Sequence, residues 1–191
     1  MSPRLPLVLS ERDLPLAELL AAALDGEVFR VGGAFAPIDE IVGPAHRAHA
    51  ILDPAPARYI AEQRSAAWVW GAIEAPPAIH EFCVDIGARV TASPARRQHV
   101  REVVIEPQEI TTFGGVSVTT PLRTAVDLAR FSEHFGDGEV FATFELMRLA
   151  DFTVADCVTE LHRRRNLPNK RLAIHRITQL TLTGSRVPGT A

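Results

Sequence analysis

Histidine and acidic side chains occur at two spacings that could support metal chemistry. His46 and His49 stand three positions apart, which on a helix would turn both rings toward one ion, but no cysteine or third histidine is close in sequence. His80-Glu81 matches half of a zinc-protease helix motif and lacks the second histidine. We therefore interpret the His46–His49 segment as a surface helix and expect no metal site and no catalytic residue.

Phosphate chemistry and nuclease chemistry also lack their usual residues. Two glycine pairs, Gly32-Gly33 and Gly114-Gly115, do not have the spacing of a phosphate-binding loop and are typical of turns. Lys170 is the one lysine in the chain. The acids on expected strands, which a restriction-type nuclease would pair with a lysine, have none nearby; they are Glu81, Asp85 and Glu102. We expect no cofactor.

A strand-to-helix junction carries a more specific pattern. The strand that ends at Val118-Thr119 is followed by Thr120, a good helix cap, and by Pro121, which suits the first helical position. Arg123 and Asp127 then stand four residues apart, so their side chains can pair along one helix face. An exposed pair would contribute only about a few tenths of a kcal/mol, so a strong role requires at least partial burial.

Charge is distributed very unevenly along the chain. Residues 1–160 hold 13 Lys and Arg against 23 Asp and Glu, whereas residues 161–191 hold seven cations and no acid. This asymmetry predicts an acidic body with a basic segment near the C-terminal end. We expect the densest part of that segment to contact an acidic protein surface or nucleic acid, the alternative being a solvated helix end; it comprises Arg163, Arg164, Arg165, Lys170, Arg171 and Arg176.

The elements that must position these residues begin with a helix and a hairpin. Leucines and alanines recur at three-to-four spacing over 14–25, and Gly26 follows as a helix-ending glycine. Residues 27–37 predict two short strands around Gly32-Gly33. A helix followed at once by a hairpin is typical of the second half of a winged helix-turn-helix. We therefore expect a minimal or degenerate unit of this kind over 1–48, and a second domain over 49–191.

Periodicity changes twice in the second domain. Helices are expected over 44–52 and 56–70, and three apolar segments in a β region over 79–118 predict strands that pair antiparallel, at 79–86, 100–105 and 110–118. After Thr120 the pattern is helical, with candidates at 121–131, 138–150, 154–165 and 168–182. The expected fold class is α+β: a small winged-helix-like N-terminal unit of helix plus hairpin, a mixed β-sheet, and a helical C-terminal half.

Composition narrows the class of protein. Hydrophobic residues make up 47% of the 191 and charged residues 23%, which is ordinary for a globular domain. No apolar run approaches the roughly 20 residues of a membrane helix, and the N-terminus lacks a signal-peptide core, so we expect a cytoplasmic protein without a membrane partner. Cys83 and Cys157 predict buried thiols rather than a disulfide or redox pair.

Two segments resemble the AbiEi family of antitoxins, found in type IV toxin–antitoxin systems of actinobacterial type. One is the helix that contains Ser65, Trp68 and Gly71; the other is Val118 to Ala129, with Thr120, Pro121, Arg123 and Asp127 as its motif residues. The resemblance covers roughly 14–165. It implies a winged-helix N-terminus, where Arg30 is the candidate DNA contact, and a C-terminal domain that carries antitoxicity.

The resemblance also implies a function. It identifies the chain as an antitoxin that neutralises a cognate toxin of nucleotidyltransferase fold and that also represses its own operator DNA. Two alternatives remain open at this point. One is an enzyme-type antitoxin that inactivates its toxin by covalent modification such as phosphorylation, through an atypical active site without a motif. The other is a stand-alone DNA-binding repressor.

Overall fold

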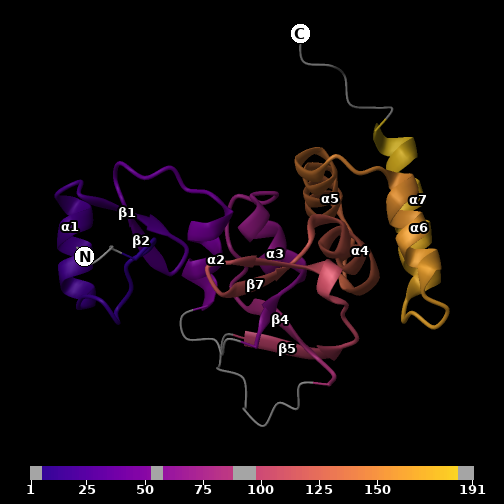
Figure 1. Ribbon diagram of the computed structural model, residues 1–191. Helices are drawn as coiled ribbons and strands as arrows, with labels where there is room; N and C mark the ends of the chain where they lie inside the picture. Colours follow the sequence, from indigo (N-terminus) through magenta and orange to yellow (C-terminus); the bar gives the residue numbers. More distant parts are fainter. Residues whose placement is uncertain (1–5, 53–57, 88–97, 185–191) are drawn as a thin grey trace. The chain divides into compact units, whose positions relative to one another are not determined.

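The computed structural model describes residues 6–52, 58–87 and 98–184 (Figure 1). Within these ranges the chain forms seven α-helices, a short 3₁₀ turn and two β-sheets, which confirms the α+β class. It divides into two compact units, an N-terminal unit of Met1–Thr119 and a C-terminal unit of Thr120–Ala191. The boundary expected between residues 48 and 49 stays a prediction.

The N-terminal unit opens with the predicted helix and hairpin. Helix α1 (Leu16–Leu24) is followed by strands β1 (Val28–Val31) and β2 (Ala34–Pro37), which pair antiparallel. Gly26 has φ +75° just beyond the helix, a left-handed conformation that glycine adopts at little cost. Leu19 is the buried residue of α1 and packs against Val28 and Phe35.

The second sheet has five strands in the order β5-β4-β3-β7-β6. Their bounds are β3 Ile60–Ala61, β4 His80–Asp85, β5 Gln98–Val103, β6 Ile110–Phe113 and β7 Val116–Thr119, with the 3₁₀ turn η1 (Pro107–Glu109) before β6. Strands β6 and β7 form an antiparallel hairpin over Gly114-Gly115, so the turn at these glycines is as predicted but the single strand expected over 110–118 is two strands. The antiparallel expectation is wrong for β4 and β5, which run parallel. A parallel neighbour needs a connection of roughly a dozen residues, and residues 86–97 supply it.

The prediction of a helix over 56–70 is wrong for residues 60–61 and confirmed for residues 63–70. Helix α2 (Pro44–Leu52) is as predicted, but Ile60 and Ala61 form the central strand β3, which pairs with both β4 and β7. Helix α3 (Gln63–Trp70) begins only afterwards, at Gln63 with φ +47°. An apolar run of a few residues fits a central strand as well as a helix, so periodicity could not separate them. Residues 56 and 57 lie outside the described residues.

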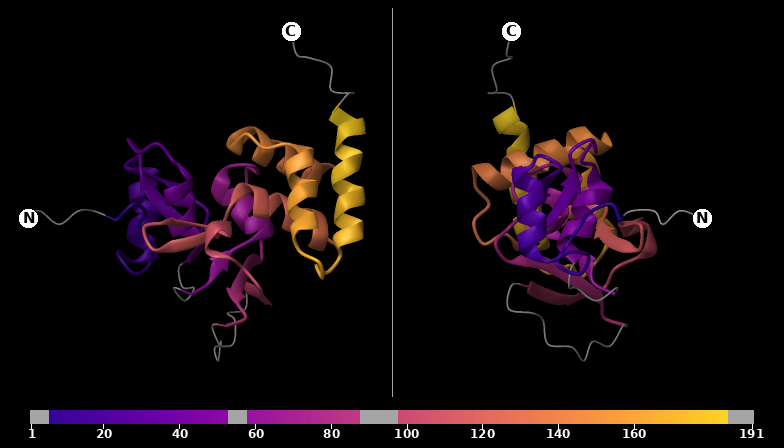
Figure 2. Two further views of the ribbon diagram at one scale, coloured as in Figure 1. Left: turned by 45° about the vertical axis from the view of Figure 1, so that its right-hand side comes forward. Right: turned by 90° about the vertical axis from the view of Figure 1, so that its left-hand side faces the viewer.

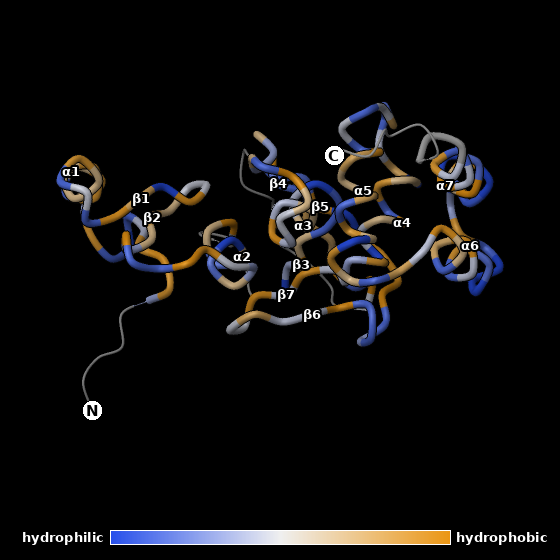
Figure 3. The backbone as a smooth tube through the Cα atoms, turned by 90° about the horizontal axis from the view of Figure 1, so that it is seen from above, coloured by the Kyte–Doolittle hydropathy of each residue, from blue (hydrophilic) through white to orange (hydrophobic). Residues whose placement is uncertain are grey.

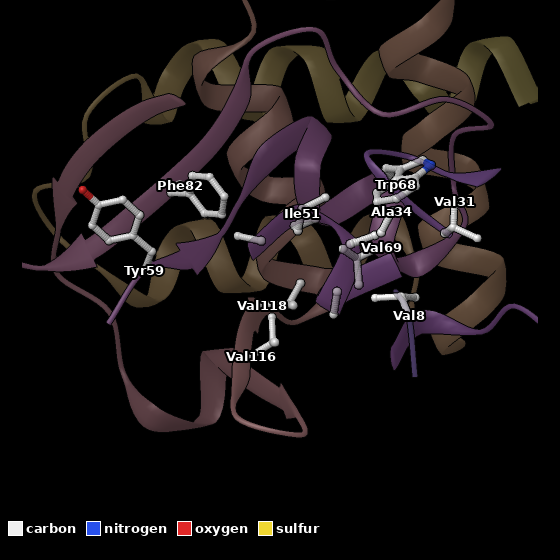
Figure 4. Packing of buried hydrophobic residues seen from close by; sticks show 14 of the residues in the cluster. Val8, Val31, Ala34, Ile51, Tyr59, Trp68, Val69, Phe82, Val116 and Val118 are labelled. Carbon is white, nitrogen blue, oxygen red and sulfur yellow. The ribbon is translucent and has the colours of Figure 1, made fainter. Parts of the chain in front are cut away.

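The core of the N-terminal unit joins the hairpin to the sheet through α2 and α3. Val31 and Ala34 of the hairpin, Ile51 of α2, Trp68 of α3 and Phe82 of β4 belong to one buried cluster (Figure 4). Burial of this apolar surface is the main force that stabilises the unit. The indole of Trp70 adds a hydrogen bond within this unit: its Nε1 donates to the carbonyl of Thr119 over 2.9 Å.

Helix α2 is not the surface helix expected from its histidines. Ala48 and Ile51 are buried, and His46 is only 7% exposed, with its Nε2 3.6 Å from a carboxylate oxygen of Glu40. The buried residues Ala48, Ala50 and Ile51 turn one face of this helix inward, where it packs against α3, β6 and β7. His49 lies over Gly114, so that a Cβ there would stand 2.6 Å from the imidazole Nε2.

Two partly buried histidines should make the N-terminal unit sensitive to acid. Burial, and then the charge of His46, lowers the pKa of His49 from 6.5, and burial lowers the pKa of His80. The unfolded chain therefore takes up protons that the folded unit resists. Their contribution to stability is complete above pH 6.5 and is lost as the pH falls through the lowered pKa values.

Urea unfolding is measured from about pH 7.5 to about pH 5.5, a range that brackets the titration of histidine. The proteins compared are the parent and a His49→Gln/His80→Gln variant. Tryptophan fluorescence follows this unit alone, because both tryptophans lie within it. We expect stability to fall less with acid in the variant. Glu81, whose pKa is raised mainly by burial, acts in the opposite sense but is present in both proteins. A His134→Gln variant, at an exposed site outside this unit, is the control; parallel curves for all three proteins would contradict the prediction.

Over residues 120–184 the C-terminal unit is made of four helices, as predicted. They are α4 (Pro121–Phe131), α5 (Asp137–Ala150), α6 (Val154–Arg163) and α7 (Lys170–Gly184). Helices α6 and α7 pack side by side, and both also contact α4 (Figure 2). Buried residues come from each helix and include Leu128, Leu146, Leu161 and Ile177. The expected bounds differ mainly at the α6–α7 connection, because α6 ends at Arg163 and α7 begins at Lys170.

Both cysteines are buried thiols, as predicted, and one lies in each unit. Burial raises the pKa of Cys157 to about 12, so its thiol stays protonated at neutral pH.

Candidate functional site

The junction at Thr120 begins α4 as its sequence predicts. The Thr120 side chain accepts a hydrogen bond from the backbone nitrogen of Arg123 over 3.4 Å, and Pro121 occupies the first turn. The hydroxyl of Thr124 donates back to the carbonyl of Thr120 over 2.8 Å. These contacts fix the start of the helix and therefore the direction in which Arg123 and Asp127 project.

Asp127 is the centre of a buried charge cluster. Its Oδ2 accepts from Nε of Arg123 and its Oδ1 accepts from Nη1 of Arg130, both over 2.7 Å. The carboxylate is 0% exposed and the two arginines are 4% and 5% exposed. The Arg123–Asp127 pair that the sequence indicated is therefore internal. Arg130 was missed, although its i+3 position relative to Asp127 was a signal that could have found it.

Arg130 connects this cluster to the loop between α6 and α7. Its Nε donates to the carbonyl of Pro168 over 3.0 Å, and Nδ2 of Asn169 donates to the Arg130 carbonyl over 3.0 Å. Asn169 has φ +57°, a conformation that asparagine tolerates better than most residues. Two hydrogen bonds thus connect α4, the helix of the Arg123–Asp127 motif, to the α6–α7 loop. The sequence pattern did not reveal them.

The α6–α7 hollow is an open depression of about 620 Å³ on this loop. It combines cationic, amide and apolar side chains, and its lining consists of Arg165, Asn166, Leu167, Pro168, Asn169, Lys170, Arg171 and Leu172. The hydrophilic character of the neighbouring turns of α6 and α7 is visible in Figure 3. Cations at a concave surface favour an anionic group, and the N-terminal end of α7 contributes to the same positive potential.

The structure separates the six predicted cations by their contacts, and Arg164 is among those that are engaged. Arg163 pairs with Glu160 one turn earlier, at 2.9 Å, and Lys170 donates to the carbonyl of Arg164 over 2.9 Å. Arg176 donates to the carbonyls of Ala129 and Ser132, each over 3.0 Å, and so fastens α7 to the end of α4.

Arg165 and Arg171 are different. Both are exposed at the hollow, and no hydrogen bond or ion pair with the described residues engages their side chains. Their role in partner binding, like that of the whole basic segment, stays a prediction.

The other motif residues stabilise the N-terminal unit. Ser65 is buried and its Oγ accepts from the backbone nitrogen of Glu81 over 2.8 Å, while the Glu81 carboxylate accepts from the backbone nitrogen of Arg64 over 2.8 Å. Gly71 ends α3 with φ +84°, and a Cβ there would meet the guanidinium of Arg47 at 2.6 Å. That guanidinium donates to the carbonyl of Trp68 over 3.2 Å.

A buried ion pair in this unit was also missed. Glu62 is 0% exposed and receives two hydrogen bonds from Arg101, of 2.7 and 2.5 Å. Glu62 follows β3, where the sequence pattern predicts a helix, so the strand register that brings Glu62 close to β5 was not predicted. The Glu62 carboxylate is therefore one member of a structural ion pair with Arg101 and not a reactive group.

Arg30, the predicted DNA contact, lies exposed on β1, where its Nε donates to the carbonyl of Gly32 over 3.3 Å. Its role stays a prediction. No group of three or more potential metal-ligating side chains occurs within the ranges that the structure covers. None of the helices in those ranges is long and apolar enough to cross a membrane.

Comparison with known proteins places the motif residues in a defined family region. Residues 59–178 match the family model of the AbiEi antitoxin C-terminal domain. No curated protein matches the chain. The fold is similar to a solved structure described as the crystal structure of RV2827C protein from Mycobacterium tuberculosis, with a TM-score of 0.50 and 18% identity, over 94% of this chain and 72% of that chain. At this identity the similarity concerns the fold alone.

Proposed function

Because the chain belongs to the AbiEi antitoxin family, we propose that it neutralises a cognate toxin of the nucleotidyltransferase type by binding it directly. The observation that carries the proposal is the family match over 59–178, which includes the central sheet and most of the helical unit. The basic segment supports direct binding. An antitoxin acts on a particular partner, and an exposed cationic surface on a chain with net charge −3 gives that partner a distinct place to bind.

The test first asks whether a nucleotidyltransferase-like protein is encoded next to this gene, and then uses that protein as the toxin. Co-expression of the chain should restore growth that the toxin arrests, and the purified proteins should form a complex without nucleotide or divalent metal. The toxin recovered from the complex should have an unchanged mass. Rescue that requires nucleotide and metal, together with an increase in toxin mass, would overturn direct binding and favour covalent modification. Failure to rescue growth would overturn the antitoxin assignment for this toxin.

A second candidate function is repression of the chain's own operator. The observation that favours it is the succession of α1 and the β1–β2 hairpin with Arg30 exposed, an arrangement that a wing in a DNA groove would use. Promoter DNA should then be retarded, with an affinity that falls steeply as salt rises, and Arg30→Glu should weaken this retardation. Equal retardation of the parent and the variant would overturn the role of the hairpin.

A further inference from the structure

We propose that the α6–α7 hollow is the surface that receives an acidic segment of the toxin, with Arg165 and Arg171 as the cations that bind its carboxylates. This inference rests on the proposed antitoxin function and adds to it a defined site and the chemistry of the partner. It also divides the basic segment into two functional groups. One group stabilises the helical unit, and the other contacts the partner.

The first step is the availability of the cations. Arg163 and Arg176 are engaged within the unit by Glu160 and by the carbonyls at the end of α4, and Lys170 is engaged by the Arg164 carbonyl. Binding a partner through these residues would require those contacts to be broken. Arg165 and Arg171 have no such contact with the described residues, so they can form new ion pairs without losing old ones.

The second step is the shape and composition of the hollow. Leu167, Pro168 and Leu172 lie in its lining beside the cations, and Leu172 is 44% exposed. Arginine next to apolar contact area is typical of the energetically important centre of a protein–protein interface. Nucleic acid instead requires a line of cations that follows successive phosphates, and two exposed arginines, one in the α6–α7 loop and one in the first turn of α7, do not provide it. The observations therefore favour a protein partner.

The third step is preorganisation. The loop backbone is held by Arg130 at the Pro168 carbonyl, by Asn169 at the Arg130 carbonyl, and indirectly by Asp127, which fixes the Arg130 guanidinium. A loop that is already ordered loses less conformational entropy when its partner binds. This explains how a motif buried in α4 can serve a surface that lies on the α6–α7 loop.

The experiment compares two variants with the same change in charge. The Arg165→Glu/Arg171→Glu variant reverses the charge of the two exposed arginines at the hollow. The Arg58→Glu/Arg148→Glu variant reverses the charge of two exposed arginines outside it. Toxin binding by the full chain is measured by titration calorimetry at low and at physiological salt. We expect the first variant to bind toxin at least about tenfold more weakly at low salt, with a smaller loss at higher salt. The control variant should bind within about threefold of the parent.

Thermal unfolding of both variants accompanies the titration. The hollow variant should match the parent, and the control should differ only slightly, because Arg148→Glu removes an exposed surface pair with Glu145. Equal toxin binding by the parent and the hollow variant would overturn the proposal, and so would an equal loss in the two variants. If the parent itself does not bind the toxin, the proposed function fails first. A loss confined to promoter DNA would assign the hollow to nucleic acid and overturn the protein partner.

Discussion

Replacing Asp127 with alanine is expected to lower the free energy of unfolding of the C-terminal unit by about 3 to 5 kcal/mol. The carboxylate is 0% exposed and joins two arginines that are themselves almost fully buried. Alanine removes this negative charge and leaves the two positive charges in an environment that solvates them poorly. The same change releases Arg130 from its fixed position, so the loop at Pro168 should also become less ordered.

Urea unfolding followed by far-ultraviolet circular dichroism measures this effect. The C-terminal unit contains no tryptophan or tyrosine, so tryptophan fluorescence, which follows the N-terminal unit, should change little in the same samples. Glu145→Ala is the matched control, because it removes an i,i+3 pair with Arg148 at the surface and should cost far less. If both variants unfold at the same urea concentration, Asp127 is not a buried organising charge.

The order of elements was accessible from sequence wherever a local signal was strong. Gly26 beyond α1, the glycine pairs in the two hairpins and Thr120-Pro121 at α4 each fix a backbone conformation through their own chemistry. Strand β3 was not accessible, because two residues paired on both sides by distant strands leave no periodicity to detect. The parallel direction of β5 was missed for a related reason, since it depends on a connection rather than on a pattern within the strand.

The candidate site likewise has residues that the sequence predicts and contacts that it does not. Arg123 and Asp127 were found because they lie on one helix at a pairing distance, and the basic segment was found because charge can be counted along a chain. The link between them depends on Arg130, Pro168 and Asn169, which come together only through packing of α4 against the α6–α7 loop. A contact of this kind leaves no spacing signal in a single sequence. The contacts of Arg163 and Arg176 likewise required three-dimensional structure.

Trp68 should be the most costly apolar residue to remove from the N-terminal unit. It is 3% exposed and lies in the cluster that joins the hairpin to α2, α3 and the sheet (Figure 4). Trp68→Ala is expected to lower the free energy of unfolding by about 3 to 5 kcal/mol. The protein loses the hydrophobic free energy of burying the indole, and a cavity is left behind. Fluorescence of Trp70 remains as the probe, and loss of less than about 1 kcal/mol would show that the hairpin closes over the gap.

Gly32 provides a sharper test of the same packing. It has φ +58°, and a Cβ there would stand 2.8 Å from Cη2 of Trp68, closer than the two atoms can approach. Gly32→Ala therefore combines a backbone cost of roughly 1 kcal/mol with a steric clash. Trp68→Phe removes the indole atoms that cause the clash and leaves the backbone cost unchanged.

A double-mutant cycle separates the two costs. Gly32→Ala should destabilise the parent by more than it destabilises the Trp68→Phe variant, with a coupling of about 0.5 to 3 kcal/mol, the range found for residues in contact. Gly115→Ala is the control, since φ there is +92° and no atom lies within 4 Å of the Cβ position, so its cost should be the same in both backgrounds. An equal cost of Gly32→Ala in both backgrounds would mean that the glycine serves the turn alone. Unequal costs would show that the first hairpin depends on Gly32 because Trp68 of α3 packs directly against it.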